Sequence, residues 1–128
     1  MEHECIIGIG SNIEPEKNIA AALHILRQDH ELGAVSTMVK TSPIGITEQP
    51  DFLNGAAKVF TTMEVADFKL YLKTVEDRLN RDRTTPKYGP RTIDLDILIW
   101  DGEIIDPDYY NRDFLQVAVK EITQNQTL

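Results

Sequence analysis

The pattern of hydrophobic and polar positions changes its period along the chain, which predicts both helices and strands. Apolar residues at helical spacing predict a helix over residues 15–29, with Pro15 in its first turn, and a second helix over residues 64–80. A last, short helix is predicted over residues 114–122. Apolar runs rich in β-branched residues predict strands over residues 4–10, 35–40, 52–61 and 94–100, with residues 103–105 as a hairpin partner of the last one.

The order of these elements, β-α-β-β-α-β, is that of the ferredoxin-like split βαβ motif. We therefore predict an α+β fold with a mostly antiparallel sheet and helices on one face, so that the other face is open for a site. The chain has 128 residues, of which 41% are hydrophobic and 27% are charged, and these values are ordinary for a globular protein. Because no repeat or linker divides the chain, residues 1–128 are expected to form a single domain.

Two carboxylates stand out on the strand predicted over residues 94–100. Asp94 and Asp96 are two positions apart, so in a strand they share a face and are separated by about 6.5 to 7 Å along the backbone. Mg²⁺ prefers oxygen ligands, and one or two carboxylates with substrate phosphates and waters usually complete its shell. Such a pair can therefore bind the two metal ions of a phosphate-handling site. A strand end with two solvated aspartates is the alternative interpretation.

The segment before this strand is unusually basic for an acidic chain. The sequence has 21 acidic and 13 basic residues, yet five of the 13 lie within residues 78–91. The Thr-Thr-Pro and Gly-Pro sequences within residues 81–91 predict a loop. Because guanidinium groups bind phosphate oxygens bidentately, this loop next to a carboxylate pair favours a polyphosphate ligand over an ordinary solvated loop.

The net charge of -8 argues against nucleic acid as a partner, because binding to a phosphate backbone requires a broad basic surface. A small anionic ligand fits better. No apolar run is long enough for a membrane span, and residues 1–4 are too polar for a signal peptide, so we expect a cytoplasmic protein without a membrane partner. Cys5 is expected to be a buried apolar residue, and the three histidines lack metal-ligand spacing. The sequence makes no prediction of oligomeric state.

The segment KYGPRTIDLDIL at residues 87–98 resembles the signature of the 6-hydroxymethyl-7,8-dihydropterin pyrophosphokinase family of the folate pathway. Three further segments resemble motifs of that family in the same order, namely GSN at 10–12, TSPIG at 41–45 and QPDFLN at 49–54. The resemblance covers roughly residues 4–105 and resumes near residues 111–114. It implies transfer of the β,γ-pyrophosphate of ATP to the hydroxymethyl oxygen of the pterin, with release of AMP.

The resemblance also implies which residues meet each ligand. Two Mg²⁺ ions would be held by Asp94 and Asp96. The pterin would be bound by Thr41, Ile44, Phe52, Asn54 and Phe114, with its ring between the two aromatic rings. The co-substrate ATP would be contacted by Glu76, Arg83, Lys87, Tyr88, Arg91, Ile97 and Arg112. Arg81 and Arg91 are predicted to be catalytic, because phosphoryl transfer depends on positioning and electrostatic stabilisation more than on a strong base.

The chain departs from the family after the carboxylate strand. The family usually has a longer segment there, with a Pro-His-Pro-like sequence, whereas this chain has only DPDYY at residues 106–110 and also stops short of the usual C-terminus. A non-catalytic paralogue that binds a pterin or nucleotide is therefore an alternative, although such a protein has no need of both carboxylates. A metal-dependent nucleotidyl transferase is a third hypothesis, which leaves Asn54 and residues 41–45 without a purpose.

Overall fold

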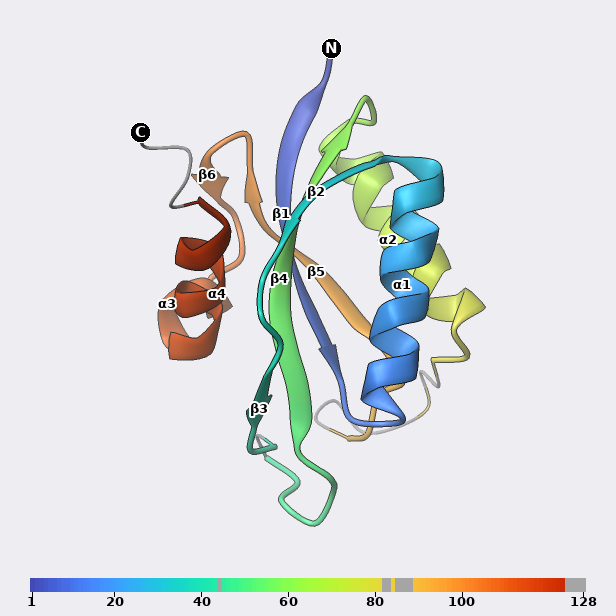
Figure 1. The fold of residues 1–128 in the computed structure, drawn as a ribbon, viewed down its shortest axis with the longest axis vertical. Helices are drawn as coiled ribbons and strands as arrows, with labels where there is room; N and C mark the ends of the chain where they lie inside the picture. Colours follow the sequence, from blue (N-terminus) through green and yellow to red (C-terminus); the bar gives the residue numbers. More distant parts are fainter. Residues whose placement is uncertain (44, 82–83, 85–88, 124–128) are drawn as a thin grey trace.

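The computed structural model describes residues 1–43, 45–81, 84 and 89–123 of the chain (Figure 1). In chain order the elements are β1 (His3–Ser11), α1 (Pro15–Asp29), β2 (Glu31–Val35), β3 (Val39–Thr41), β4 (Phe52–Thr61), α2 (Val65–Arg78), β5 (Asp94–Trp100), β6 (Glu103–Ile104), α3 (Asp108–Asn111) and α4 (Asp113–Thr123). No helix in the described ranges has the length and apolar character of a membrane span.

The described strands form one antiparallel sheet with the order β2-β4-β1-β5-β6, and β3 pairs with β4 beyond the end of β2. β1 lies at its centre, between β4 and β5, and every residue of β1 except Glu4 is buried. A strand that is covered on both faces is apolar on both, which explains the nearly continuous apolar run at residues 5–9.

One face of the sheet is covered by α1 and α2 (Figure 1). The apolar stripe of each helix, at the spacing expected for one helical face, turns toward the sheet. The packed residues are Ile19, Ala22 and Leu26 from α1, Phe68, Leu72 and Val75 from α2, and the alternate strand residues Cys5, Ile7, Ile9, Leu95 and Ile97. This core fixes β5 against α2, so the remaining face of β5 is directed away from the two helices.

The opposite face is partly covered by α4, which Figure 1 shows on the other side of the sheet from α1. Leu115, Ala118, Val119 and Ile122 of α4 pack on residues of β1, β4 and β5 that include Ile6, Ala56 and Leu98. The predicted α+β fold with an antiparallel sheet and packed helices is confirmed. The face that was expected to be open is thus divided between a second core under α4 and the surface described below.

The prediction of one strand over residues 35–40 is wrong, because β2 ends at Val35 and β3 begins at Val39. The break follows from Ser36, whose N–H donates to the carbonyl oxygen of Ala56 at 2.9 Å and whose hydroxyl oxygen accepts the N–H of Ala56 at 2.8 Å. A side chain that takes over a backbone bond interrupts the strand pairing. The partner residue is 20 positions away, so the hydrophobic pattern of residues 35–40 does not reveal the interruption.

Candidate active site

Asp94 and Asp96 lie on the face of β5 that is turned away from α1 and α2. Leu95 and Ile97 are buried in the core beneath those helices, so alternation along the strand places both carboxylates on the opposite face. In the pairing with β1, Asp94 is opposite Gly10 and Asp96 is opposite Gly8. Because glycine has no side chain, β1 adds no bulk beside the two carboxylates.

A chain of ion pairs holds two arginines at these carboxylates. The Nη1 atom of Arg81 lies 2.7 Å from Oε2 of Glu76 and 3.2 Å from Oδ1 of Asp94. The Nη1 atom of Arg91 lies 3.2 Å from the same oxygen of Asp94. Glu76 is itself fixed, because its buried carboxylate accepts the backbone N–H of Leu95 at 2.8 Å. The two arginines predicted to be catalytic are therefore positioned beside the predicted metal ligands.

Asp96 lies in an acidic surrounding. Loss of water around the carboxyl group is the largest cause that raises its pKa to about 7, followed by the charges of Asp94, Glu76 and Asp106, while Arg81 acts in the opposite direction. Asp96 is exposed on this face of the sheet, and the three neighbouring carboxylates raise its pKa in the same direction as burial. A cation next to the carboxyl group favours its charged form.

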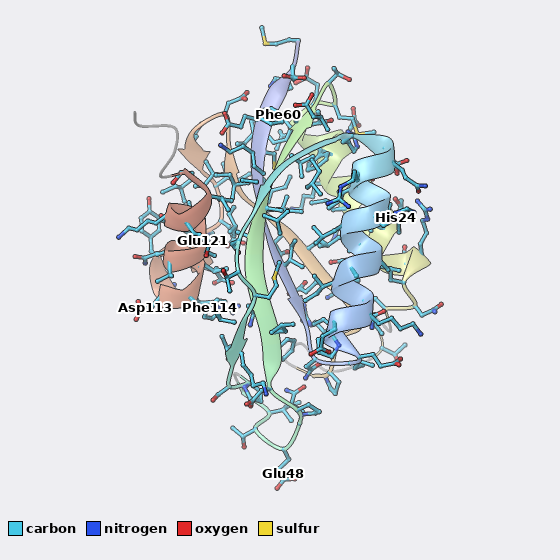
Figure 2. All side chains as sticks on the ribbon, viewed as in Figure 1. His24, Glu48, Phe60, Asp113, Phe114 and Glu121 are labelled. Carbon is cyan, nitrogen blue, oxygen red and sulfur yellow. The ribbon has the colours of Figure 1, made fainter. Side chains whose placement is uncertain are left out.

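A first pocket of about 280 Å³ lies on this face, between the sheet and the start of α4. Four of the residues predicted to bind the pterin line it: Thr41 at the end of β3, Phe52 and Asn54 on β4, and Phe114 on α4. Figure 2 shows Phe114 at the end of α4 that lies beside the strands. The pocket therefore brings together two aromatic rings and one amide from two elements, β4 and α4, that are far apart in the sequence.

Asn54 is held in the first pocket from two sides. Its Nδ2 atom donates a hydrogen bond to the hydroxyl oxygen of Thr41 on the neighbouring strand. On its other side Asn54 pairs with Gly10 of β1, where an added Cβ would lie 2.6 Å from Oδ1 of Asn54. Real Cβ contacts essentially never fall below 3.0 Å, so the observed position of Asn54 requires a glycine at position 10.

A second pocket lies between α2 and β5. Glu76 and Ile97, which were predicted to contact ATP, and Arg81, which was predicted to be catalytic, line this pocket. Its other lining residues include the apolar Val65, Leu72 and Ile105 and the basic Lys69 and Lys73. The second pocket thus combines apolar surface with basic residues and with the acidic residues that pair with Arg81 or border the first pocket.

The two pockets meet at the carboxylates. Arg91, Asp94, Asp96 and Asp106 line both of them. The predicted metal ligands thus stand at the boundary between a pocket with aromatic rings and a pocket with basic residues.

One predicted residue lines the other pocket, and four predicted residues are not among those that the structure describes. Arg112 was predicted to contact the nucleotide, but it lines the first pocket, where its Nη2 atom lies 3.4 Å from Oδ2 of Asp108. The predicted ligands Ile44, Arg83, Lys87 and Tyr88 lie outside the described residues. For these four the sequence prediction is unchanged.

Two further residues line the site or are bonded to residues that line it, and neither was singled out by the sequence analysis. Asp106 lines both pockets. Asn12 is 3% exposed and joins the end of β1 to residues 49–50 and to Arg91 by hydrogen bonds. The available signals were the GSN segment at the end of a buried strand and the Asp-Pro-Asp turn at residues 106–108, but neither shows its long-range partners.

The carboxylate oxygens of Asp94 and Asp96 are donors that suit a hard cation such as Mg²⁺. Within the described residues no three His, Cys, Asp or Glu side chains are arranged to hold a metal ion by themselves. Mg²⁺ does not require such a cage, because it keeps waters and takes oxygens from a bound phosphate. Asp94 and Asp96, which share one face and border a pocket with basic residues, fit this mode of binding.

Two carboxylates and Arg91 stand between the two pockets, and Arg81 is paired with one of these carboxylates. On an antiparallel α+β fold this arrangement suits a phosphoryl-transfer enzyme. The family model for 7,8-dihydro-6-hydroxymethylpterin-pyrophosphokinase matches residues 6–124. The chain therefore belongs to this family.

Individual relatives agree with the family match. The chain is 33% identical to the 2-amino-4-hydroxy-6-hydroxymethyldihydropteridine pyrophosphokinase of Haemophilus influenzae, over 95% of this chain and 82% of that protein. It is 32% identical to the enzyme of the same name from Bacillus subtilis, over 97% of this chain and 80% of that protein. The corresponding Aquifex aeolicus protein is 31% identical, over 93% of this chain and 79% of that protein.

Proposed function

We propose that this chain transfers the pyrophosphoryl group of ATP to the hydroxymethyl oxygen of 6-hydroxymethyl-7,8-dihydropterin and releases AMP. The observation that carries the proposal is the position of Asp94 and Asp96 at the boundary of the two pockets. A group that passes from one bound molecule to another must cross such a boundary. The family match and the names of the relatives support the same reaction.

The first pocket is assigned to the pterin. A pterin is flat and presents alternating donors and acceptors along one edge, so it requires ring surfaces and a group that can both donate and accept. Phe52 and Phe114 supply the ring surfaces, and the Asn54 amide supplies the donor and acceptor. The hydrogen bond to Thr41 and the contact with Gly10 fix that amide before the ligand binds, which lowers the entropic cost of binding.

The second pocket is assigned to ATP. Its apolar residues suit the base, and Lys69 and Lys73 add positive charge near the phosphates. Arg81 and Arg91 are held at the boundary by Glu76 and Asp94, so their guanidinium groups are placed before any phosphate arrives. Charge that is fixed in advance stabilises a transition state better than charge that must reorganise. The predicted contacts of Arg83, Lys87 and Tyr88 with the nucleotide remain part of this proposal, whereas Arg112 lines the pocket assigned to the pterin.

Asp94 and Asp96 would hold two Mg²⁺ ions, which neutralise charge on the phosphates when they are bound. In the reaction the hydroxymethyl oxygen of the pterin forms a bond to the β-phosphorus of ATP, and the bond from that phosphorus to the bridging oxygen of the α-phosphate breaks. The bridging oxygen leaves with AMP, and the hydroxyl proton is released to solvent. Arg81 and Arg91 stabilise the charge of the group in transfer, and the walls of the pockets keep the two reactants in line.

The experiment is a measurement of AMP release from ATP, Mg²⁺ and 6-hydroxymethyl-7,8-dihydropterin by the purified protein. Asp96→Asn removes one predicted metal ligand, and Asp67→Asn is the matched control, because Asp67 is an exposed residue of α2 outside both pockets. We expect AMP release that depends on the pterin, is unchanged in the control and falls by at least about 10²-fold in Asp96→Asn.

Two results contradict the proposal. Turnover near the wild-type value in Asp96→Asn excludes the assignment of the metal pair. Pterin binding by the wild-type protein without any release of AMP excludes the enzyme and supports the non-catalytic paralogue.

A further inference from the structure

The buried side chain of Asn12 connects three segments that the sequence separates widely. Asn12 follows the last residue of β1 and is 3% exposed. Its Nδ2 atom donates to Oε1 of Gln49 at 2.9 Å and to the carbonyl oxygen of Pro50 at 3.0 Å. Its Oδ1 atom accepts the backbone N–H of Arg91 at 2.8 Å, and its own N–H donates to the carbonyl oxygen of Arg91 at 3.1 Å.

The partners of Asn12 fix the orientation of its amide. The N–H of Arg91 can only donate and the carbonyl of Pro50 can only accept, so the oxygen of Asn12 must face Arg91 and its nitrogen must face Pro50. Gln49 then presents its oxygen to Asn12, and its Nε2 atom donates to the carbonyl oxygen of Ile46 at 2.8 Å. The hydrogen bonds from Arg91 through Asn12 and Gln49 to Ile46 run in one direction, and bonds in such a chain strengthen one another.

Each end of this hydrogen-bond chain is next to residues that line the proposed active site. The segment at residues 45–51 lies between β3 and β4, and the end residues Thr41 and Phe52 of these strands line the first pocket. Figure 2 shows Glu48 at the tip of this segment, which extends beyond the ends of the strands. At the other end, Arg91 lines both pockets and is paired with Asp94. We call residues 45–52, which end at Phe52 in the first pocket, the pterin wall. The hydrogen bonds of Asn12 connect this wall to the backbone of Arg91.

We propose that Asn12 is a positioning residue, which holds the pterin wall at residues 45–52 and the backbone of Arg91 in one relative arrangement. The proposal rests on the proposed function for the identity of the ligand, but its structural part does not. Asn12 itself lines neither pocket, so its effect reaches the ligands through the groups to which it is bonded.

Asn12→Asp separates the role of the Asn12 side chain as a hydrogen-bond donor from its role as an acceptor. Aspartate has the shape of asparagine and keeps an acceptor for the N–H of Arg91, but above its pKa it cannot donate to Gln49 and Pro50. We expect the Kd and KM for the pterin to rise about tenfold, which corresponds to about 1.4 kcal/mol. The affinity for ATP and kcat are expected to stay within about threefold of the wild-type values, which correspond to less than about 1 kcal/mol.

Asn12→Ala removes the acceptor as well. Because it frees the backbone of Arg91, it is expected to lower kcat by a further factor of about ten in addition to weakening pterin binding. Asn18→Ala is the matched control, because its Nδ2 atom donates only to the nearby carbonyl of Ile13, at 2.6 Å, and connects no distant segments. This control is expected to leave both pterin constants and kcat unchanged.

Hydrogen exchange measured by mass spectrometry tests the connection without any ligand. We expect faster exchange at residues 45–52 in Asn12→Asp, and faster exchange at residues 45–52 and at Arg91 in Asn12→Ala, while β1 and residues 53–61 of β4 stay protected. If Asn12→Asp does not fold, Gln49→Ala provides the same test, because Gln49 is only partly buried and its loss removes one of the two accepting partners.

The outcomes are separable. Faster exchange together with weaker pterin binding supports the proposal. Unchanged exchange at residues 45–52 overturns it, and so does faster exchange with an unchanged pterin Kd, because Asn12 would then serve the structure alone. A wild-type protein that binds no pterin contradicts the proposed function instead, while the exchange data still decide whether Asn12 joins the segments.

Discussion

Replacement of Gly10 by alanine is expected to damage the first pocket and leave the fold intact. A Cβ at position 10 would lie 2.6 Å from Oδ1 of Asn54, and ordinary contact begins at 3.4 Å, so the amide must move by the difference, about 0.8 Å. A movement of this size breaks the geometry of the hydrogen bond between Asn54 and Thr41 and turns the amide away from its observed direction.

This movement of the Asn54 amide is expected to weaken binding of the pterin. A polar group that is left without its partner costs about 1–3 kcal/mol, so the Kd for the pterin is expected to rise by about 5- to 150-fold. The fold gains slightly, because alanine is more favourable than glycine within a strand by about 0.5–1 kcal/mol, and this gain offsets part of the clash. ATP binding is expected to be unchanged, because neither Gly10 nor Asn54 lines the second pocket.

Gly8→Ala is the matched control for this substitution. Gly8 lies two residues earlier on the same face of β1, but a Cβ there would meet Leu98 at 3.4 Å, which is an ordinary contact. Fluorescence titration with 6-hydroxymethyl-7,8-dihydropterin, and a separate titration with ATP, measure the two affinities, and thermal unfolding checks the fold. A folded Gly10→Ala protein with wild-type pterin affinity refutes the reasoning, as does an equal loss of pterin affinity in Gly8→Ala.

Three further predictions concern stability and reactivity. Glu76→Ala leaves Arg81 and the N–H of Leu95 without the Glu76 carboxylate, so the free energy of unfolding, measured in urea, should fall by about 3 kcal/mol. A loss below about 1 kcal/mol contradicts the ion-pair argument. Cys5 is fully buried and burial raises its pKa to about 12, so a thiol reagent should label it only after unfolding, and rapid labelling of the native protein is the contrary result. The hydrogen bond from His3, and after it that from the N–H of Glu4, lower the pKa of Asp101 below 3.8. The charged form of Asp101 therefore adds stability that is present above pH 3.8 and is lost as the pH falls through the lowered pKa. The stability difference between wild type and Asp101→Asn should therefore shrink as the pH falls from about 5 to about 2, and a constant difference argues against this bond.

The sequence predicted the two long helices and the carboxylate strand because each has a local pattern that its environment reinforces. The apolar stripes of α1 and α2 repeat at the helical period over four turns or so, and they bury one face of each helix as that period requires. Asp94 and Asp96 were assigned to one face by alternation alone, and Leu95 and Ile97 are indeed buried on the other face.

The second strand was mispredicted for a reason that no local pattern contains. The interruption at Ser36 depends on a hydrogen bond to Ala56 across the sheet. The position of α4 was likewise undetermined, because its apolar stripe fits any apolar surface, and only the assembled sheet offers Ile6, Ala56 and Leu98 as a second core.

The sequence by itself determined the periods of the elements, the chemistry of the site and, through its motifs, the family. It could do so because these depend on the order and kinds of residues within a short segment. Only the tertiary structure decided that the carboxylates stand between two pockets, that Gly10 makes room for Asn54, and that Asn12 joins the pterin wall to Arg91. These relations join residues about 40 to 80 positions apart, so they arise from strand register and packing, which a linear pattern does not specify.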